Sequence, residues 1–146
     1  MDQIKVPDQK LKGITVLIVE DNELNQQVAK GLLEYNGATV AIANHGKEAL
    51  DMLSQSSFDC ILMDVQMPVM DGLEAARLIR TNPQWSNALI IAVTANADQY
   101  HKDLCQNAGM NDFLAKPIDP ERLVDTLLKW LAPKNGVIGS VTGANR

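Results

Sequence analysis

The sequence predicts an α/β fold in which five βα units form one parallel sheet with helices on both faces. Two observations carry this prediction. From Ile14 onward, short runs rich in β-branched residues alternate with longer stretches whose apolar residues recur every three or four positions. Three of the short runs are almost continuously apolar, which is typical of parallel strands that helices cover on both sides.

Five strands are expected along the chain. Their ranges are Thr15–Val19, Thr39–Ala43, 59–63, 89–94 and Asp112–Ala115. The first, third and fourth are nearly continuous in apolar residues, which favours central positions in the sheet. The second and the fifth are more mixed in polarity, so we expect them nearer its edges.

Helices are expected between these strands and after the last one. Apolar spacing predicts the first three from Leu24, Val28, Leu32 and Tyr35, from Ala49, Leu50 and Leu53, and from Leu73, Ala76 and Ile79. Gly37 is expected to close the first helix, and a fourth helix is expected over residues 98–108. The fifth has the strongest start signal, because Asp119 suits the N-cap and Pro120 the first helical position. Its apolar face holds Leu123, Leu127, Leu128 and Leu131.

The predicted domain covers residues 13–132, and the two ends of the chain differ from it in composition. Residues 1–12 mix Lys, Gln, Asp and Pro without sustained periodicity, and residues 133–146 carry Gly, Ser, Thr and Asn without an acidic side chain. We expect a linker or a leftover expression segment at the first end and a flexible tail or linker at the second.

Composition and charge exclude several functions. Thirteen Lys and Arg against eighteen Asp and Glu give a net charge of -5, which argues against binding of nucleic acid or anionic lipid by this domain. The longest apolar runs, such as 89–93, are far shorter than a membrane span, and the first residues lack the pattern of a secretory signal. Cys60 and Cys105 are expected to be buried thiols, so we expect a cytoplasmic protein without membrane contact through this domain.

Polar side chains end four of the five predicted strands. Glu20 and Asp21 follow the first strand, and Asp64 follows the third. Thr94 ends the fourth strand, and Lys116 follows the fifth. Taken singly, each is explained as an ordinary turn, cap or surface residue. Because the carboxyl ends of parallel strands meet at one edge of a sheet, their joint occurrence instead favours a site there.

The three carboxylates of this predicted site would repel one another, so the arrangement calls for a cation. Mg²⁺, a hard ion that prefers oxygen ligands, meets that requirement. The acids contribute -3 and Mg²⁺ with Lys116 contributes +3, so the resting site would be close to neutral and able to draw in a phosphoryl group. Asp64 is the best nucleophile candidate, because it is central and follows the apolar run Ile61-Leu62-Met63.

Four segments carry a resemblance to a known family. They are Val19-Glu20-Asp21-Asn22, Asp64-Val65-Gln66-Met67-Pro68-Val69-Met70-Asp71-Gly72, Val93-Thr94-Ala95 and Ala115-Lys116-Pro117. With these segments in family order, residues 13–132 resemble a response-regulator receiver domain of two-component phosphorelay signalling, which has a flavodoxin-like fold. The run 20–28 resembles in particular the receivers that are joined to hybrid sensor histidine kinases.

The resemblance implies a set of site residues. Asp64 would accept a phosphoryl group from a phosphohistidine, and Asp21 and Asp64 would bind Mg²⁺ directly. Glu20 would hold a metal-bound water, and Gln66 would supply a backbone carbonyl.

The resemblance also implies a conformational switch made of the Thr94 hydroxyl and the ring of Phe113. Because Phe113 lacks the hydroxyl of a tyrosine, the switch would act through burial of the ring. The bond between Lys116 and Pro117 is expected to be cis, as in relatives. As a fragment of a hybrid histidine kinase, the domain would catalyse only its own phosphorylation and dephosphorylation.

The implied partner is a histidine kinase or a histidine phosphotransfer domain, and a homodimer is compatible with the resemblance. A histidine on another protein can reach Asp64 only over the carboxyl edge of the sheet. Leu24, Val28 and Ile118 are therefore candidates for an apolar contact patch. For Leu24 and Val28 the alternative is packing in the core.

Three other functions are compatible with a parallel α/β fold of this kind. A phosphohydrolase of the haloacid dehalogenase type also phosphorylates an Asp after a parallel strand, but it has Asp-x-Asp where this chain has Gln66 at the second position. A flavodoxin-like FMN binder needs a phosphate loop after the first strand, where Glu20 and Asp21 would repel the phosphate. The third is a receiver that acts as an interaction module without phosphorylation, which the complete acidic set disfavours.

Overall fold

The computed structural model describes residues 9–67 and 70–131. The strands are β1 (Thr15–Val19), β2 (Thr39–Ala43), β3 (Cys60–Asp64), β4 (Ile90–Thr94) and β5 (Asp112–Ala115). The helices are α1 (Glu23–Tyr35), α2 (Gly46–Leu53), α3 (Gly72–Thr81), α4 (Gln99–Asn107) and α5 (Pro120–Trp130). The predicted tail 133–146, residues 1–8 of the leading segment, and Pro68 and Val69 of the loop motif lie outside the described residues.

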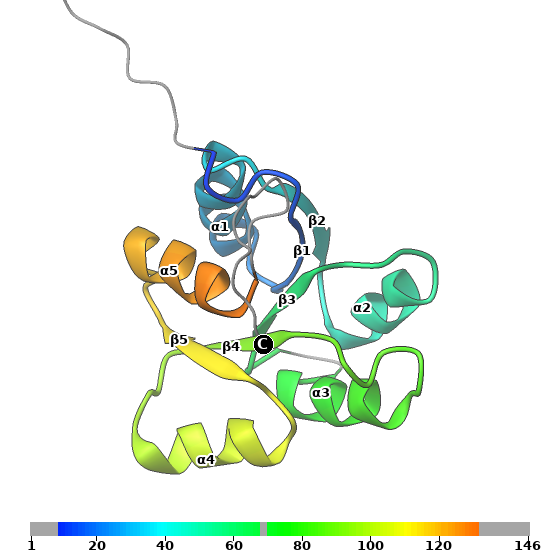
Figure 1. Cartoon of the computed structure of the whole chain (residues 1–146). Coiled ribbons are helices and arrows are strands. Elements are labelled where there is room, and N and C mark those ends of the chain that lie inside the picture. The colour runs from blue at the N-terminus through cyan, green and yellow to red at the C-terminus, as the bar shows by residue number, and fades with distance from the viewer. Residues whose placement is uncertain (1–8, 68–69, 132–146) are drawn as a thin grey trace, which may run out of the picture.

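All five strands pair in parallel in the order β2-β1-β3-β4-β5 (Figure 1). The predicted fold of five βα units is therefore confirmed, and β2 and β5 occupy the edges as their mixed polarity indicated. The chain runs from β1 outward to β2 and then returns past β1 to β3. In parallel sheets, ligands bind beyond the carboxyl ends of the strands at such a change of direction. The fold thus favours a site at the ends of β1 and β3.

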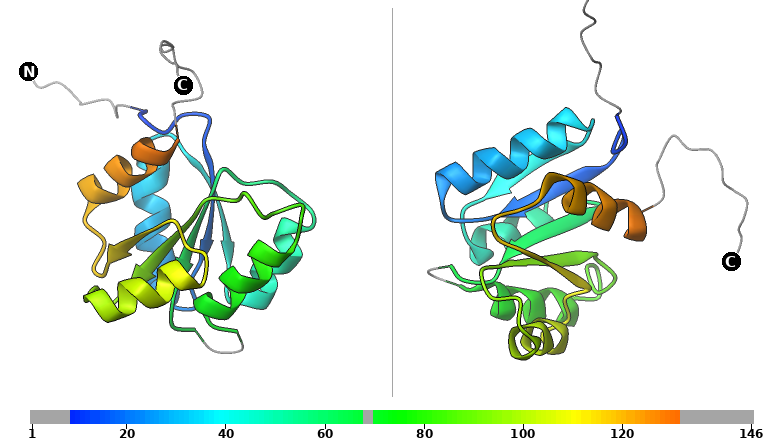
Figure 2. Two further views of the ribbon diagram at one scale, coloured as in Figure 1. Left: turned by 60° about the horizontal axis from the view of Figure 1, so that its bottom comes forward. Right: turned by 90° about the vertical axis from the view of Figure 1, so that its left-hand side faces the viewer.

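Helices cover both faces of the sheet (Figure 2). Helices α1 and α5 lie on one face, and α2, α3 and α4 lie on the other. Alternate strand residues point into two hydrophobic clusters, because side chains alternate across a strand. Val16 and Ile18 of β1 pack with α1 and α5, whereas Leu17 and Val19 pack with the other three helices. The strands are therefore held from both sides, and their polar ends are fixed in position.

Helix α1 forms where it was predicted but turns a different face to the sheet. The apolar spacing relied on Leu24, Val28, Leu32 and Tyr35. Leu24, Val28 and Tyr35 are 72%, 49% and 57% exposed, and only Leu32 packs partly buried against the core cluster. Leu24 and Val28 therefore do not pack in the core, which was the alternative to their role as contact residues, because a polar residue and a small residue occupy the stripe that meets the sheet. The buried residues are Gln26, Ala29 and Leu33.

The packed domain includes residues before position 13. Leu11 is fully buried in the cluster beside α1, and its N–H donates to the carbonyl of Asn36 at 2.7 Å. Residues 9–12 therefore belong to the packed structure, although the segment 1–12 was expected to be a linker.

The two cysteines, Cys60 and Cys105, are buried free thiols, as predicted, and burial raises the pKa of each. Across the ranges 9–67 and 70–131, no helix has the length and apolar content needed to cross a membrane.

One arginine that the sequence analysis did not single out joins three parts of the chain. Nε of Arg80, near the end of α3, donates to the carbonyl of Gly109 at 2.8 Å. Its Nη1 donates to the carbonyls of Ser86 and Ala88 at 3.0 and 2.7 Å, and its Nη2 donates to Oδ1 of Asn111 at 2.8 Å. Gly109 has a φ of +99°, and a side chain there would collide with Arg80. Arg80 thus fixes α3 to the segments that precede β4 and β5.

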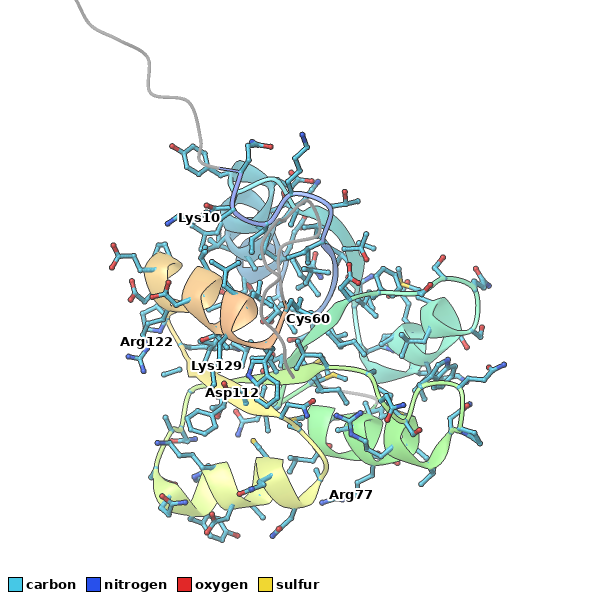
Figure 3. All side chains as sticks on the ribbon, in the orientation of Figure 1. Lys10, Cys60, Arg77, Asp112, Arg122 and Lys129 are labelled. Atoms are coloured by element: carbon cyan, nitrogen blue, oxygen red, sulfur yellow. The ribbon has the colours of Figure 1, made fainter. Side chains whose placement is uncertain are left out.

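A second polar cluster joins the start of β5 to the end of α5. Oδ2 of Asp112 accepts a hydrogen bond from Nε1 of Trp130 at 2.9 Å and lies 3.3 Å from Nζ of Lys129. Figure 3 shows Asp112 and Lys129 side by side. Burial raises the pKa of Asp112, but the hydrogen bonds from Trp130, from the N–H of Phe113 and from Lys129 outweigh it and lower the pKa overall.

The Arg80 contacts predict a measurable stability effect. Arg80→Met should lower the free energy of unfolding by about 2–3 kcal/mol, because charge-assisted hydrogen bonds are lost and their acceptors are left unpaired. Arg77 lies on the exposed side of the same helix (Figure 3) and is the matched control. Arg77→Met should change the free energy of unfolding by less than about 0.5 kcal/mol. Urea unfolding followed by circular dichroism tests both variants, and equal losses would contradict the assignment.

Candidate functional site

Three carboxylates meet beyond the carboxyl ends of β1 and β3. Glu20 and Asp21 follow β1, Asp64 ends β3, and one oxygen of each lies within 4.8 Å of the others. Glu20 and Asp64 are 5% and 3% exposed, whereas Asp21 is open to solvent. The cluster therefore has a buried floor and one accessible acid, so an incoming group can approach it from the solvent side.

Lys116 brings a positive charge to these acids. Its Nζ lies 3.2 Å from Oδ1 of Asp64 and 3.5 Å from Oε1 of Glu20. The bond from Lys116 to Pro117 is cis, as the resemblance implied. One ammonium group faces three carboxylates, so a net negative charge is left for a divalent cation to neutralise. Because the donors are all carboxylate oxygens, the cluster suits a hard ion such as Mg²⁺.

The surroundings of Glu20 disfavour its charged form. Burial raises the pKa of Glu20 above its ordinary value of 4.5, and the charge of Asp64 adds to that effect. The N–H of Asn22, which donates to Oε2 of Glu20 at 3.1 Å, and the ammonium of Lys116 oppose it without cancelling it. A cation bound among the acids would favour the ionised carboxylate.

Two residues that follow β3, Gln66 and Gly72, lie close to Asp64. The N–H of Gln66 donates to Oδ1 of Asp64 at 3.2 Å. Gly72, at the start of α3, lies so close to the carbonyl of Asp64 that a side chain there would collide with it. Gln66, whose carbonyl is an implied metal ligand, is thus held against the end of β3.

The two predicted switch residues lie on neighbouring strands. Thr94 is buried at the end of β4, and its hydroxyl donates to the carbonyl of Asn96 and accepts from the N–H of Asn96, both at 3.0 Å. Phe113 on β5 is half-buried, and Nζ of Lys102 lies 4.5 Å from the centre of its ring. The hydroxyl is therefore engaged by its own loop, and the ring is in contact with a cation on α4.

Two of the three predicted contact residues, Val28 and Ile118, line a groove together with acids of the cluster. Leu24 and Val28 are exposed on α1, so the alternative that they pack in the core is wrong for both. Ile118 is half-buried, and with Val28 it lines a groove of about 170 Å³ that also includes Asp64 and Lys116. An apolar surface therefore leads from the outer face of α1 to the acidic cluster.

Gln26 and Asn44 also belong to this region, although the sequence analysis did not single them out. Nε2 of Gln26 donates to the carbonyl of Glu20 at 2.6 Å and to Oδ1 of Asn44 at 2.8 Å. A polar residue on the buried face of an amphipathic helix is the signal that would have indicated Gln26. That signal was missed because only the apolar positions of α1 were considered.

The fold and the site together define an α/β domain with an acidic, oxygen-lined cation site that faces a lysine at the carboxyl edge of a parallel sheet. The chain belongs to the response regulator receiver domain family, whose model matches residues 16–128. It is therefore a receiver domain, the phosphoacceptor module of two-component signalling. This membership replaces the phosphohydrolase and FMN-binding alternatives.

The chain is similar to parts of larger histidine kinases. It is 40% identical over 138 residues to the signal transduction histidine-protein kinase BarA of Escherichia coli K12, covering 94% of this chain and 15% of BarA. It is 37% identical over 142 residues to histidine kinase 5 of Arabidopsis thaliana, covering 80% of this chain and 15% of that protein. The chain thus spans less than a fifth of the length of these two relatives.

Solved structures show the same fold. The receiver domain of the sensor histidine kinase PA1611 from Pseudomonas aeruginosa, with a magnesium ion coordinated in its active site cleft, matches with a TM-score of 0.76 and 41% identity. That match covers 81% of this chain and 97% of the other. A chain from the co-crystal structure of the Saccharomyces cerevisiae histidine phosphotransfer protein Ypd1 with the receiver domain of Ssk1 matches with a TM-score of 0.77 and 32% identity. That match covers 82% and 90% of the two chains.

The electrostatics of the cluster predict opposite pKa changes in two variants of the metal-free protein. Asp64→Asn should lower the pKa of Glu20, because a nearby negative charge is removed, and Lys116→Met should raise it, because a positive charge is removed. Carbon-13 NMR titration of the side-chain carboxyls measures both. The pKa of Glu48, which depends mainly on hydrogen bonds from Asn44, should stay the same and serves as the control. A shift of the Glu20 pKa in the same direction in both variants would contradict the described cluster.

Proposed function

We propose that this domain takes a phosphoryl group from a phosphohistidine onto Asp64 in a Mg²⁺-dependent reaction and then changes conformation to relay a signal. The position of Asp64 carries the proposal. This carboxylate lies at the buried end of β3, close to two further acids and 3.2 Å from the ammonium of Lys116. A nucleophile, a cation site and a fixed positive charge are the parts that phosphoryl transfer to a carboxylate requires.

The transfer begins when a carboxylate oxygen of Asp64 attacks phosphorus in line with the P–N bond of the phosphohistidine. That bond breaks, its electron pair stays on the imidazole nitrogen, and an acyl phosphate forms on Asp64. Lys116 and the N–H of Gln66 both contact Oδ1, so we assign the attack to Oδ2. Lys116 is then close enough to neutralise an oxygen of the transferred group.

Mg²⁺ would be held by the carboxylates of Asp21 and Asp64 and by the backbone carbonyl of Gln66, with Glu20 acting through a bound water. When bound, the ion supplies positive charge that stabilises the phosphoryl oxygens. The all-oxygen donor cluster supports this assignment, as does the magnesium ion in the cleft of the PA1611 receiver domain.

The partner that best fits this site is a histidine phosphotransfer domain or a histidine kinase. We assign the contact to Leu24, Val28 and Ile118, because their apolar surface adjoins the groove that reaches Asp64. The co-crystal structure of Ypd1 with the Ssk1 receiver supports a phosphotransfer partner. BarA and the hybrid kinase relatives support a place within a hybrid histidine kinase. A cytoplasmic location and association of two copies stay predictions.

Phosphorylation of Asp64 is tested with acetyl phosphate and Mg²⁺. Wild type should gain one hydroxylamine-labile phosphoryl group per chain, as measured by intact-mass spectrometry. Asp64→Asn should gain none, because the nucleophilic carboxylate is absent. Asp125→Asn, which changes an exposed acid on α5, should match wild type. Labelling of Asp64→Asn to the wild-type extent would remove Asp64 from its role.

The switch is tested at Thr94. In Thr94→Ala, phosphorylation should persist while the phosphorylation-induced amide shifts along β4 and β5 are largely lost. The reason is that the alanine has no hydroxyl that could leave the carbonyl of Asn96 and donate to a phosphoryl oxygen instead. Thr94→Ser keeps the hydroxyl and should keep the shifts. Full-sized shifts in the alanine variant, measured by NMR, would show that the readout bypasses Thr94.

The docking surface is tested with two phosphodonors. Ile118→Asp should slow transfer from a phosphorylated histidine phosphotransfer protein by about tenfold or more, because a charge enters an apolar contact. Labelling by acetyl phosphate, which needs no docking surface, should be retained. Leu78→Asp, at an exposed apolar position on the other face of the sheet, is the control and should affect neither reaction. Parallel loss of both reactions in folded Ile118→Asp would place Ile118 in the chemical step instead.

A further inference from the structure

Gln26 is a polar side chain at a position where α1 meets the sheet. It is 6% exposed and lies on the same face of the helix as Ala29 and Leu33. An amide at such a position costs free energy unless its hydrogen bonds are made. Nε2 makes two, one to the carbonyl of Glu20 at 2.6 Å and one to Oδ1 of Asn44 at 2.8 Å. Both hydrogens of the amide group are therefore in use.

The contact with Glu20 acts on the backbone that joins two acids of the site. The carbonyl of Glu20 belongs to the peptide unit between Glu20 and Asp21, so a hydrogen bond to it fixes the plane of that unit. The N–H of Glu20 donates to the carbonyl of Ala43 at 3.1 Å, which fixes the preceding peptide unit as well. The turn from β1 to α1 is thus held on both sides of Glu20.

The contact with Asn44 connects Gln26 to the start of α2. The backbone N–H and Nδ2 of Asn44 donate to Oε1 of Glu48 at 2.5 and 3.0 Å. The N–H of Glu48 donates in turn to Nδ1 of His45, the N-cap of α2. A continuous chain of hydrogen bonds therefore runs from the Glu20 backbone through Gln26 and Asn44 to the first turn of α2.

This chain opposes the repulsion within the acidic cluster. Without a cation, three carboxylates within 4.8 Å favour any motion of the turn that separates them. A turn that moved apart would have to be ordered again when a cation binds, at a cost in conformational entropy. Holding the peptide unit between Glu20 and Asp21 removes that cost.

We propose that Gln26 is a positioning residue, which fixes the peptide unit between Glu20 and Asp21 in the conformation that a divalent cation requires. Asn44 orients the Gln26 amide for this role. The inference rests on the magnesium site of the proposed function. It assigns to a buried residue of α1, which touches neither the cation nor the phosphoryl group, a share of the affinity for Mg²⁺.

The test compares Gln26→Met with Gln27→Met in the full chain. Methionine keeps the length of the side chain and removes the amide, and Gln27 is the exposed neighbour on the same helix. Calorimetric titration of the metal-free protein with MgCl₂ should show a Kd raised about tenfold in Gln26→Met and changed by less than about twofold in Gln27→Met. In Gln26→Met the rise in Tm caused by Mg²⁺ should shrink, and the metal-free amides of Asp21 and Asn22 should exchange faster. Exchange within β3 and β4 should be unchanged.

Each outcome decides the question. Equal Mg²⁺ affinity in Gln26→Met and Gln27→Met overturns the inference, even when Gln26→Met is the less stable protein. Failure of wild type to bind Mg²⁺ overturns the proposed metal site, and the inference falls with it. If Gln26→Met does not fold, Asn44→Ala takes its place, because it removes the orienting acceptor from an exposed position. Weakened Mg²⁺ binding in Asn44→Ala then supports the inference, and wild-type affinity overturns it.

Discussion

Mutual repulsion among Glu20, Asp21 and Asp64 is the constraint on which the rest of the structure depends. Three carboxylates with oxygens within 4.8 Å cannot remain together in water unless other parts of the chain hold them there. The acids lie at the carboxyl ends of the paired strands β1 and β3. Lys116 follows β5 and contacts Asp64 and Glu20. Burial strengthens the repulsion and the attraction alike, since both act at a lower effective dielectric constant than in water. Binding of a cation or a phosphoryl group at these strand ends would therefore change the electrostatic free energy of the cluster strongly.

The carboxyl ends and the amino ends of the strands contribute differently to binding and to stability. The carboxyl edge carries like charges, exposed apolar side chains and a groove, which are unfavourable for stability but useful for binding. The amino edge carries Arg80 and Asp112, whose hydrogen bonds join α3 and α5 to the starts of β4 and β5. Between them lie the two hydrophobic clusters, with β3 and β4 buried along their full length. The contacts at the amino ends of the strands thus stabilise the domain and offset the unfavourable repulsion at the carboxyl ends.

The sequence allowed the strands and the acidic cluster to be predicted, because both leave local patterns. Apolar runs mark the buried strands, and polar residues directly after them mark the edge where the strands end. The buried stripe of α1 was not predicted, because a glutamine such as Gln26 gives no sign of burial in sequence, and Leu24 and Val28 were compatible with either the core or a contact surface. The Arg80 network leaves no pattern at all, since its carbonyl acceptors are backbone groups that any residue provides. Such contacts follow only from the three-dimensional arrangement of distant segments.

The hydrogen bond between Trp130 and Asp112 has a consequence for how the molecule can be observed. Trp130 is one of two tryptophans in the chain, and its indole N–H donates a hydrogen bond to the carboxylate of Asp112 at the beginning of β5. The N–H of the next residue, Phe113, donates to Oδ1 of the same carboxylate at 2.9 Å, so a shift of the Phe113 backbone would also change the surroundings of the indole. Indole emission responds to nearby charge and to the loss of a hydrogen bond. The protein therefore carries an intrinsic fluorophore at the end of α5 whose indole is hydrogen-bonded to the first residue of β5, the strand that contains Phe113.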